Sequence, residues 1–183
     1  MNYCIYGAAS DKIDSKYKDV VTDLCYELGK KGHTLVFGAG GTGVMGAAAR
    51  GATKAQSEII GISPSFMKEF EPMYDKCTTL LVTENMAERK LKLEGYSDLF
   101  VVCPGGIGTF DEFFQIITLR KLKRHNKEII LFNFEGFYDD LVAYMDKCAE
   151  LGFISKDIRS AFMLINTKEE IIEYFDNFVM EDK

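Results

Sequence analysis

The feature that most constrains the fold of this chain is the alternation of short apolar runs with longer helical segments. Each apolar run is four or five residues long and is followed by a turn and a segment of helical character. This alternation is typical of a parallel sheet whose strands are buried on both faces and joined by helices. The sequence therefore predicts an α/β fold: a single doubly wound parallel sheet, Rossmann-like, with helices on both faces. The predicted strands are Tyr3–Tyr6, Thr34–Phe37, Ile59–Ile62, Thr79–Val82, Leu99–Cys103, Ile129–Phe132 and Ala161–Ile165.

Between these runs the apolar residues follow helical spacing. In the first such segment the i, i+3, i+4, i+7 pattern runs from Tyr17 to Leu28. Asn85 followed by Glu88 fits a capping box and predicts that a helix begins there. Residues 63–76 have no clear period and are expected to form a flap or a crossover. The other predicted helices cover 44–55, the stretch that ends near Arg124, 138–149 and 169–178.

Length and composition exclude several classes of protein. No linker divides the 183 residues, so we expect one nucleotide-binding domain over 1–183. The net charge of −6 disfavours a binder of nucleic acid or of anionic membranes, since both need a basic face. The five cysteines form no CxxC pair, which indicates reduced thiols rather than disulfides or a metal site. With no secretory signal and no membrane-spanning stretch, we expect a cytoplasmic protein.

The glycine-rich stretch Pro104–Glu112 lies between an apolar run and an amphipathic one. A strand, a glycine turn and a helix present backbone N–H groups and a helix N-terminus to a phosphate. The alternative is a tight connection that binds nothing. A second turn, with Gly38, Gly40 and Gly43 in G-x-G-x-x-G spacing, follows the second strand and is weak evidence for a dinucleotide.

Charged side chains near these turns have structural as well as functional interpretations. Thr109 and Glu112 fit a capping box by spacing, so Glu112 is either a cap or a catalytic carboxylate. Arg89, taken alone, is more often a solvated helix residue. The basic run 120–127 is interpreted as favourable placement at a helix C-terminus rather than as an anion or nucleic-acid site.

Two motifs together carry a resemblance to a known family. Pro-Gly-Gly-x-Gly-Thr-x-x-Glu at 104–112 and Met-x-x-Arg-Lys at 86–90 are similar to signatures of the LOG ("Lonely guy") family, which are cytokinin-activating nucleoside 5′-monophosphate phosphoribohydrolases. The turn 40–46 resembles a further signature, and the likeness extends over nearly the whole chain. Asp111, Gln115 and Leu119 depart from the usual pattern, which leaves the preferred base open.

The resemblance implies an activity and a set of site residues. The expected reaction is hydrolysis of the N-glycosidic bond of AMP or its N6-prenylated forms, giving free base and ribose 5-phosphate, with no metal or other cofactor. The catalytic pair carries over onto Arg89 and Glu112. The implied substrate contacts are Glu71, Lys90, Gly105, Gly106, Gly108, Thr109, Thr118, Gly41, Gly43 and Met86. Glu69 remains an alternative to Glu71, and the family pattern implies a homodimer.

The sequence leaves two other functions open. One is a non-catalytic protein of the same fold that binds or senses nucleotides. The other is the lysine decarboxylase activity with which members of this family have often been labelled. That reaction requires pyridoxal phosphate on a Schiff-base lysine, and no lysine of this sequence has a recognisable setting for it.

Overall fold

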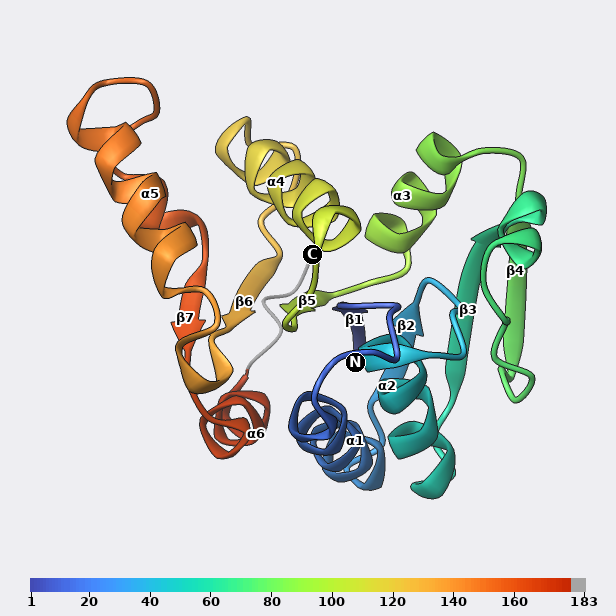
Figure 1. The fold of residues 1–183 in the computed structure, drawn as a ribbon. Coiled ribbons are helices and arrows are strands. Elements are labelled where there is room, and N and C mark those ends of the chain that lie inside the picture. Colours follow the sequence, from blue (N-terminus) through green and yellow to red (C-terminus); the bar gives the residue numbers. More distant parts are fainter. Residues whose placement is uncertain (179–183) are drawn as a thin grey trace.

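The computed structural model describes residues 1–178, in which seven strands form one sheet of order β4-β3-β2-β1-β5-β6-β7. Every neighbouring pair of strands is parallel, as the apolar runs predict. The doubly wound fold is therefore confirmed (Figure 1). The strands are β1 (Asn2–Tyr6), β2 (Thr34–Phe37), β3 (Ile59–Pro64), β4 (Thr79–Thr83), β5 (Leu99–Val102), β6 (Glu128–Phe132) and β7 (Met163–Ile165).

Helices cover both faces of the sheet (Figure 1). One layer contains α1 (Ser15–Lys30), α2 (Gly43–Lys54) and α6 (Lys168–Asn177), and the other contains α3 (Met86–Gly95), α4 (Ile107–Lys121) and α5 (Asp139–Glu150). Short 3₁₀ turns, η1 (Ser65–Glu69), η2 (Phe134–Gly136) and η3 (Ile158–Ala161), lie in the connections. No helix among residues 1–178 is both long enough and apolar enough to cross a membrane.

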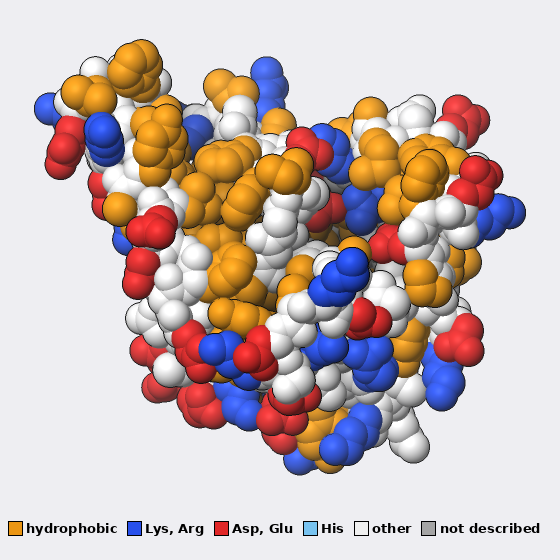
Figure 2. Space-filling model, viewed as in Figure 1, with side chains coloured by type: hydrophobic (Ala, Val, Ile, Leu, Met, Phe, Trp, Pro, Cys, Tyr) orange, Lys and Arg blue, Asp and Glu red, His pale blue; other side chains and the backbone are white. Residues whose placement is uncertain are grey.

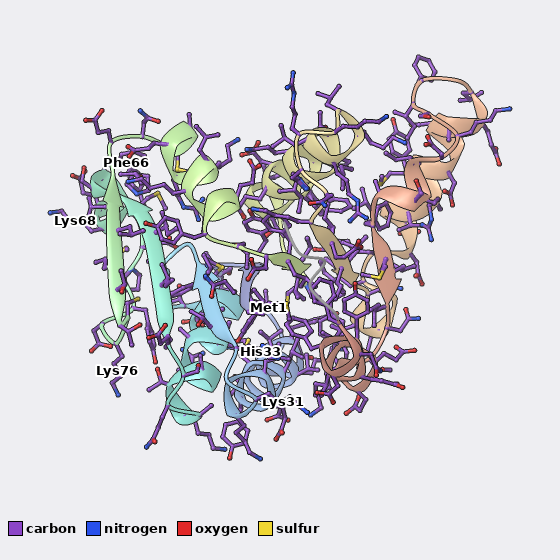
Figure 3. The ribbon with its side chains drawn as sticks, turned by 180° about the vertical axis from the view of Figure 1, so that it is seen from behind. Met1, Lys31, His33, Phe66, Lys68 and Lys76 are labelled. Atoms are coloured by element: carbon purple, nitrogen blue, oxygen red, sulfur yellow. The ribbon has the colours of Figure 1, made fainter. Side chains whose placement is uncertain are left out.

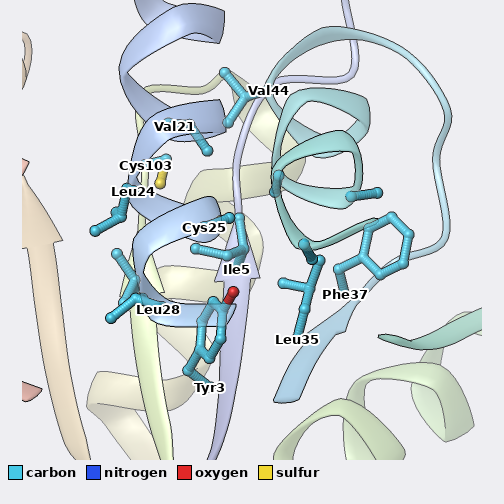
Figure 4. Close-up of a cluster of buried hydrophobic side chains, with 14 of the residues drawn as sticks. Tyr3, Ile5, Val21, Leu24, Cys25, Leu28, Leu35, Phe37, Val44 and Cys103 are labelled. Atoms are coloured by element: carbon cyan, nitrogen blue, oxygen red, sulfur yellow. The ribbon is translucent and has the colours of Figure 1, made fainter. Parts of the chain in front are cut away.

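Each face of the sheet has its own buried core because alternate side chains of a strand point to opposite faces. Tyr3 and Ile5 of β1 pack toward α1 and α2 (Figure 4), whereas Cys4 and Tyr6 pack toward α3, α4 and α5. All four residues of β5 are buried, as expected for a central parallel strand. This two-sided burial fixes the register of the sheet, because a slip of one residue would exchange the two faces.

The strand order reverses between β1 and β5, and this reversal places the functional edge of the sheet. β1 continues to β2 on one side and pairs with β5 on the other. In such sheets ligands bind in the crevice outside the carboxyl ends of the strands at this switch point. The turns that follow β1, β2 and β5 therefore meet at one edge, as their sequences predict.

The sequence predicts most element boundaries to within two residues, with three informative differences. α4 ends at Lys121 rather than near Arg124, because Leu122 closes the helix and Lys123 has a φ of 56°. The last strand begins at Met163 because η3 occupies the residues before it. The irregular stretch 63–76 completes β3, forms η1 and then crosses back over the face of the sheet that carries α2, where Met73 and Tyr74 pack against the core. Figure 3 shows Phe66 and Lys76 at opposite ends of this crossover.

Candidate active site

A buried ion pair joins the two predicted catalytic residues at the carboxyl edge of the sheet. Arg89, in the first turn of α3, donates from Nη1 to Oε1 of Glu112 on α4 at 2.7 Å. The side chains are 10% and 8% exposed, respectively. Figure 2 shows a hollow between α3 and α4, with acidic and basic side chains along its walls. Two residues 23 positions apart in the sequence thus form one charged unit.

The position of Arg89 is fixed by two further contacts that the sequence does not reveal. Its Nε donates to the backbone oxygen of Ile62 in β3 at 3.3 Å. On the other side of the guanidinium, a Cβ added at Gly38 would lie 2.0 Å from Nη2. Gly38 therefore leaves room for Arg89, and any larger residue there would displace the guanidinium. The G-x-G spacing of this turn is the only sequence signal for this role.

The capping-box interpretation of Glu112 is wrong. α4 begins at Ile107 with Gly106 as its N-cap, so Thr109 is inside the first turn and Glu112 lies in the second. The carboxylate of Glu112 accepts its hydrogen bond from Arg89 instead of from the backbone of Thr109. Burial raises the pKa of Glu112, and the neighbouring guanidinium opposes this rise. A carboxylate whose pKa lies closer to neutrality is a better proton acceptor in general-base catalysis.

The glycine turn before α4 is held rigidly to the sheet. Cys103 donates its N–H to the oxygen of Tyr6 at 2.8 Å and accepts from the hydroxyl of Tyr138 at 2.7 Å. Pro104 accepts from the N–H of Ala8 at 3.1 Å. A Cβ added at Gly105 would lie 2.1 Å from Oγ1 of Thr109, so this glycine is required for close packing of the turn on its own helix.

The N-terminus of α4 is the more open of the two glycine-associated helix starts. No side chain caps Gly106, and a Cβ added at Gly106 or Gly108 would meet nothing within 4 Å. The first turn of a helix leaves N–H groups without intrahelical partners, and these together with the helix dipole favour an anion. This arrangement matches the phosphate interpretation of Pro104–Glu112 better than the empty-connection alternative.

In the second glycine turn, the backbone N–H groups of Gly41, Gly43 and Val44 donate to acceptors within the protein. Gly43 donates its N–H to Oδ1 of Asp11 at 2.9 Å, and Val44 donates to the oxygen of Ala8 at 2.8 Å. Gly41 donates to the oxygen of Pro72 at 2.7 Å. The N–H groups of Gly41 and Gly43 therefore already have protein partners, and their predicted contact with substrate stays a prediction.

Of the two candidate glutamates in the irregular segment, Glu71 faces the site. Glu71 is half-buried, and its carboxylate oxygens would lie 3.1 and 3.3 Å from a Cβ added at Gly40. Burial raises its pKa, and the charge of Arg89 opposes the rise. Glu69 is exposed in η1. The sequence leaves this choice open because residues 63–76 have no period from which to read a face.

The remaining predicted contacts lie on α3 and α4, and they do not all reach the Arg89–Glu112 pair. Lys90 donates to both carboxylate oxygens of Asp111, at 3.1 and 3.0 Å, so a second, outer ion pair joins α3 to α4. Met86 is partly exposed at the start of α3. Thr118 is exposed and donates to the oxygen of Phe114 at 2.6 Å. It lies six residues beyond Glu112 and therefore on a different face of α4. The structure does not bring Thr118 to the Arg89–Glu112 pair.

The basic run at the other end of α4 has structural partners. Arg120 binds both carboxylate oxygens of Glu128, at 3.1 and 3.0 Å, and His125 bonds the oxygen of Ile116 at 3.0 Å. Burial lowers the pKa of His125, which favours its neutral form. A shallow pocket of about 460 Å³ lies beside Arg120, Lys123, His125 and Asn126. These contacts favour the structural interpretation of the run.

Comparison with known proteins gives a family and its relatives. The model of the family described as "Possible lysine decarboxylase" matches residues 45–175. A cytokinin riboside 5′-monophosphate phosphoribohydrolase of Arabidopsis thaliana is 30% identical over 96% of this chain and 81% of its own length. The cytokinin riboside 5′-monophosphate phosphoribohydrolase LOG of Oryza sativa subsp. japonica is 29% identical over 97% of this chain and 74% of its own length.

Solved structures with the same fold are more distant in sequence. A molybdenum cofactor binding protein from Rippkaea orientalis superposes with a TM-score of 0.70 at 23% identity, covering 96% of this chain and 93% of that one. The molybdenum cofactor carrier protein of Chlamydomonas reinhardtii gives 0.70 at 16% identity, covering 96% and 95%. At these identities the likeness shows the fold alone.

Proposed function

Because the chain belongs to the LOG family, we propose that it hydrolyses the N-glycosidic bond of a purine nucleoside 5′-monophosphate to free base and ribose 5-phosphate. We take AMP and its N6-prenylated forms as the substrates, since the relatives are named for cytokinin riboside 5′-monophosphates. The observation that carries this proposal is the buried Arg89–Glu112 pair beside the open N-terminus of α4.

In the proposed mechanism the start of α4 binds the 5′-phosphate. The N–H groups of its first turn, around Gly106 and Gly108, hold the phosphate oxygens, and the helix dipole adds to the attraction. The two glycines allow close approach because a Cβ at either position would point into open space. With the phosphate held there, Glu112 in the next turn lies within reach of the sugar.

Glu112 then acts on the bond that breaks. Cleavage of a glycosidic bond develops positive charge on the sugar, which a nearby carboxylate stabilises. The same carboxylate accepts a proton from the water that adds to the anomeric carbon. Arg89 keeps the carboxylate of Glu112 ionised and oriented, because its guanidinium donates to that carboxylate and is fixed in place by a second hydrogen bond to the backbone oxygen of Ile62. Its buried position suits a role in positioning Glu112 better than one in binding an exposed phosphate.

The residues do not fit the cofactor that a lysine decarboxylase needs. A Schiff-base lysine reacts as a neutral amine, activated by desolvation or by a neighbouring cation. Lys90, which is adjacent in sequence to Arg89, instead forms an ion pair with Asp111, and a carboxylate partner stabilises the charged ammonium. Lys90 therefore lacks the setting of a Schiff-base lysine.

We also propose that the chain acts as a homodimer through the outward face of α4. Positions 107, 114, 118 and 122 follow helical spacing along one stripe. Ile107, Phe114 and Leu122 on this stripe are exposed, and Figure 2 shows hydrophobic side chains gathered over α4. Thr118 lies among them, so its expected contact with substrate requires the site of a second copy. Phe114→Glu should yield monomers by light scattering, and an unchanged dimer would reject this face.

The enzymatic proposal is tested by base release. Purified protein is given a panel of purine nucleoside mono-, di- and triphosphates, and free base is measured by chromatography. We expect release from monophosphates, and its loss in Glu112→Gln. Asp111→Asn is the matched control, because this exposed neighbour faces Lys90 rather than Arg89. Tight nucleotide binding without release from any monophosphate would instead favour a non-catalytic sensor.

A further inference from the structure

Two glycines of the turn after β2 each leave space for the charged end of one side chain, the guanidinium of Arg89 or the carboxylate of Glu71. A Cβ added at Gly38 would lie 2.0 Å from Nη2 of Arg89, and one added at Gly40 would lie 3.1 Å from a carboxylate oxygen of Glu71. Two residues of extended chain span at most about 7 Å. The turn therefore brings the carboxylate of Glu71 close to the guanidinium of Arg89, an arrangement that the G-x-G spacing permits.

The two glutamates approach Arg89 from different sides. Glu112 binds Nη1 from α4, whereas Nη2 faces the glycine turn on which Glu71 rests. Glu71 belongs to the segment between η1 and β4, and Glu112 belongs to α4. The site thus contains two carboxylates, as glycoside hydrolysis generally requires, although their sequence separation of 41 residues conceals the pairing.

The two carboxylates have unequal partners. Glu112 forms a direct ion pair with Arg89, and among the described residues Glu71 forms no ion pair. One guanidinium therefore lies near two carboxylates, and a carboxylate without a direct hydrogen bond from the cation is less strongly held in its charged form. Burial raises the pKa of Glu71, and the charge of Arg89 offsets this rise without a hydrogen bond. The two carboxyl groups therefore differ in their hydrogen bonding: Arg89 holds Glu112 directly as a carboxylate, whereas within residues 1–178 the oxygens of Glu71 have no such donor.

We propose that Glu71 is the general acid that protonates the leaving purine, a role that rests on the proposed function. The carboxyl proton of Glu71 passes to a ring nitrogen of the base as the bond between the anomeric carbon and the base nitrogen breaks. The electron pair of that bond leaves with the base. Water adds its oxygen to the anomeric carbon and gives its proton to Glu112. The products are neutral base and ribose 5-phosphate, and one proton returns from Glu112 to Glu71 through solvent.

The test compares two leaving groups. Adenine needs a proton to leave, whereas para-nitrophenol leaves as a stable anion, so para-nitrophenyl ribofuranoside 5-phosphate bypasses a general acid. General acid catalysis contributes about 10²–10⁴-fold. We expect Glu71→Gln to lower kcat/KM for AMP by at least ~100-fold and that for the nitrophenyl substrate by less than ~10-fold. Glu112→Gln should lower both, since water must still be activated.

Glu69→Gln is the matched control, because Glu69 is two residues away and exposed, and it should change neither rate. Equal losses on both substrates in Glu71→Gln would show a binding role and overturn the proposal, as would an unchanged rate on AMP. A parent protein that hydrolyses neither substrate rejects the proposed function itself. If Glu71→Gln does not fold, Glu71→Asp gives the same ratio; it should still favour the nitrophenyl substrate, because the shorter acid is withdrawn from the base.

Discussion

Removing the guanidinium from the Arg89–Glu112 pair is the sharpest test of how this site is built. Arg89→Met retains much of the side-chain length and leaves the Glu112 carboxylate, whose side chain is 8% exposed, without its cation. Breaking a buried pair in this way costs about 3–5 kcal/mol. For a chain of 183 residues this corresponds to a fall in Tm on the order of 10 °C.

The loss of unfolding free energy in Arg89→Met should increase as the pH rises. Burial already raises the pKa of Glu112 in the folded protein, and loss of Arg89 removes the main opposing charge. A carboxyl group whose folded pKa is raised is neutral in both states below its unfolded pKa, so the penalty is absent there. The penalty grows as the pH rises and is complete above the folded pKa.

The assay is urea unfolding followed by circular dichroism, at neutral pH and at the lowest pH at which the parent stays folded. The double variant Arg89→Met/Glu112→Met removes both charges and should recover most of the loss, giving a coupling energy of about 1–3 kcal/mol or more in a double-mutant cycle. A cost below about 1 kcal/mol, as for exposed pairs, or a cost independent of pH, would refute a buried and mutually dependent pair.

Four further outcomes test the surroundings of the pair and the buried core. Gly108→Ala should stabilise α4 by about 0.5–1 kcal/mol yet raise the KM for monophosphates, because its methyl group meets no protein atom but enters the proposed phosphate site; an unchanged KM would count against that site. Gly105→Ala should instead destabilise by about 1–3 kcal/mol in thermal melts, since its Cβ would lie 2.1 Å from a side-chain oxygen of α4. Lys90→Met should raise KM with less than about 1 kcal/mol of destabilisation, because its partner carboxylate is 56% exposed, and a larger loss in urea unfolding would contradict this. Burial raises the pKa of Cys4 and of Cys25 to about 12, so both thiols should resist disulfide reagents at neutral pH until urea unfolds the chain, and fast labelling of the native protein would contradict their burial.

Much of the fold follows from local patterns. Thr34–Phe37 is predicted and observed with the same bounds, and each predicted strand has a counterpart in the sheet. Short apolar runs identify strands that are buried on both faces, and parallel pairing then directs their carboxyl ends to one edge. The capping interpretation of Thr109 and Glu112 fails because spacing alone satisfies the capping rule, although the chain already enters the helix at Gly106.

What the sequence determined by itself was the sheet, the edge at which its turns meet, and the identity of the Arg89 and Glu112 candidates. Only the tertiary structure decided how the charges are paired. It joined Arg89 to Glu112, turned the N–H of Gly43 to Asp11, and placed Glu71 rather than Glu69 beside the turn after β2. The physical reason is that periodicity reports which face of an element is buried, whereas a charge partner depends on where distant elements come together. The turn after β2 illustrates this difference. Its glycine spacing indicates that some group packs closely against the backbone, and the fold determines that these groups are the charged side chains of Arg89 and Glu71.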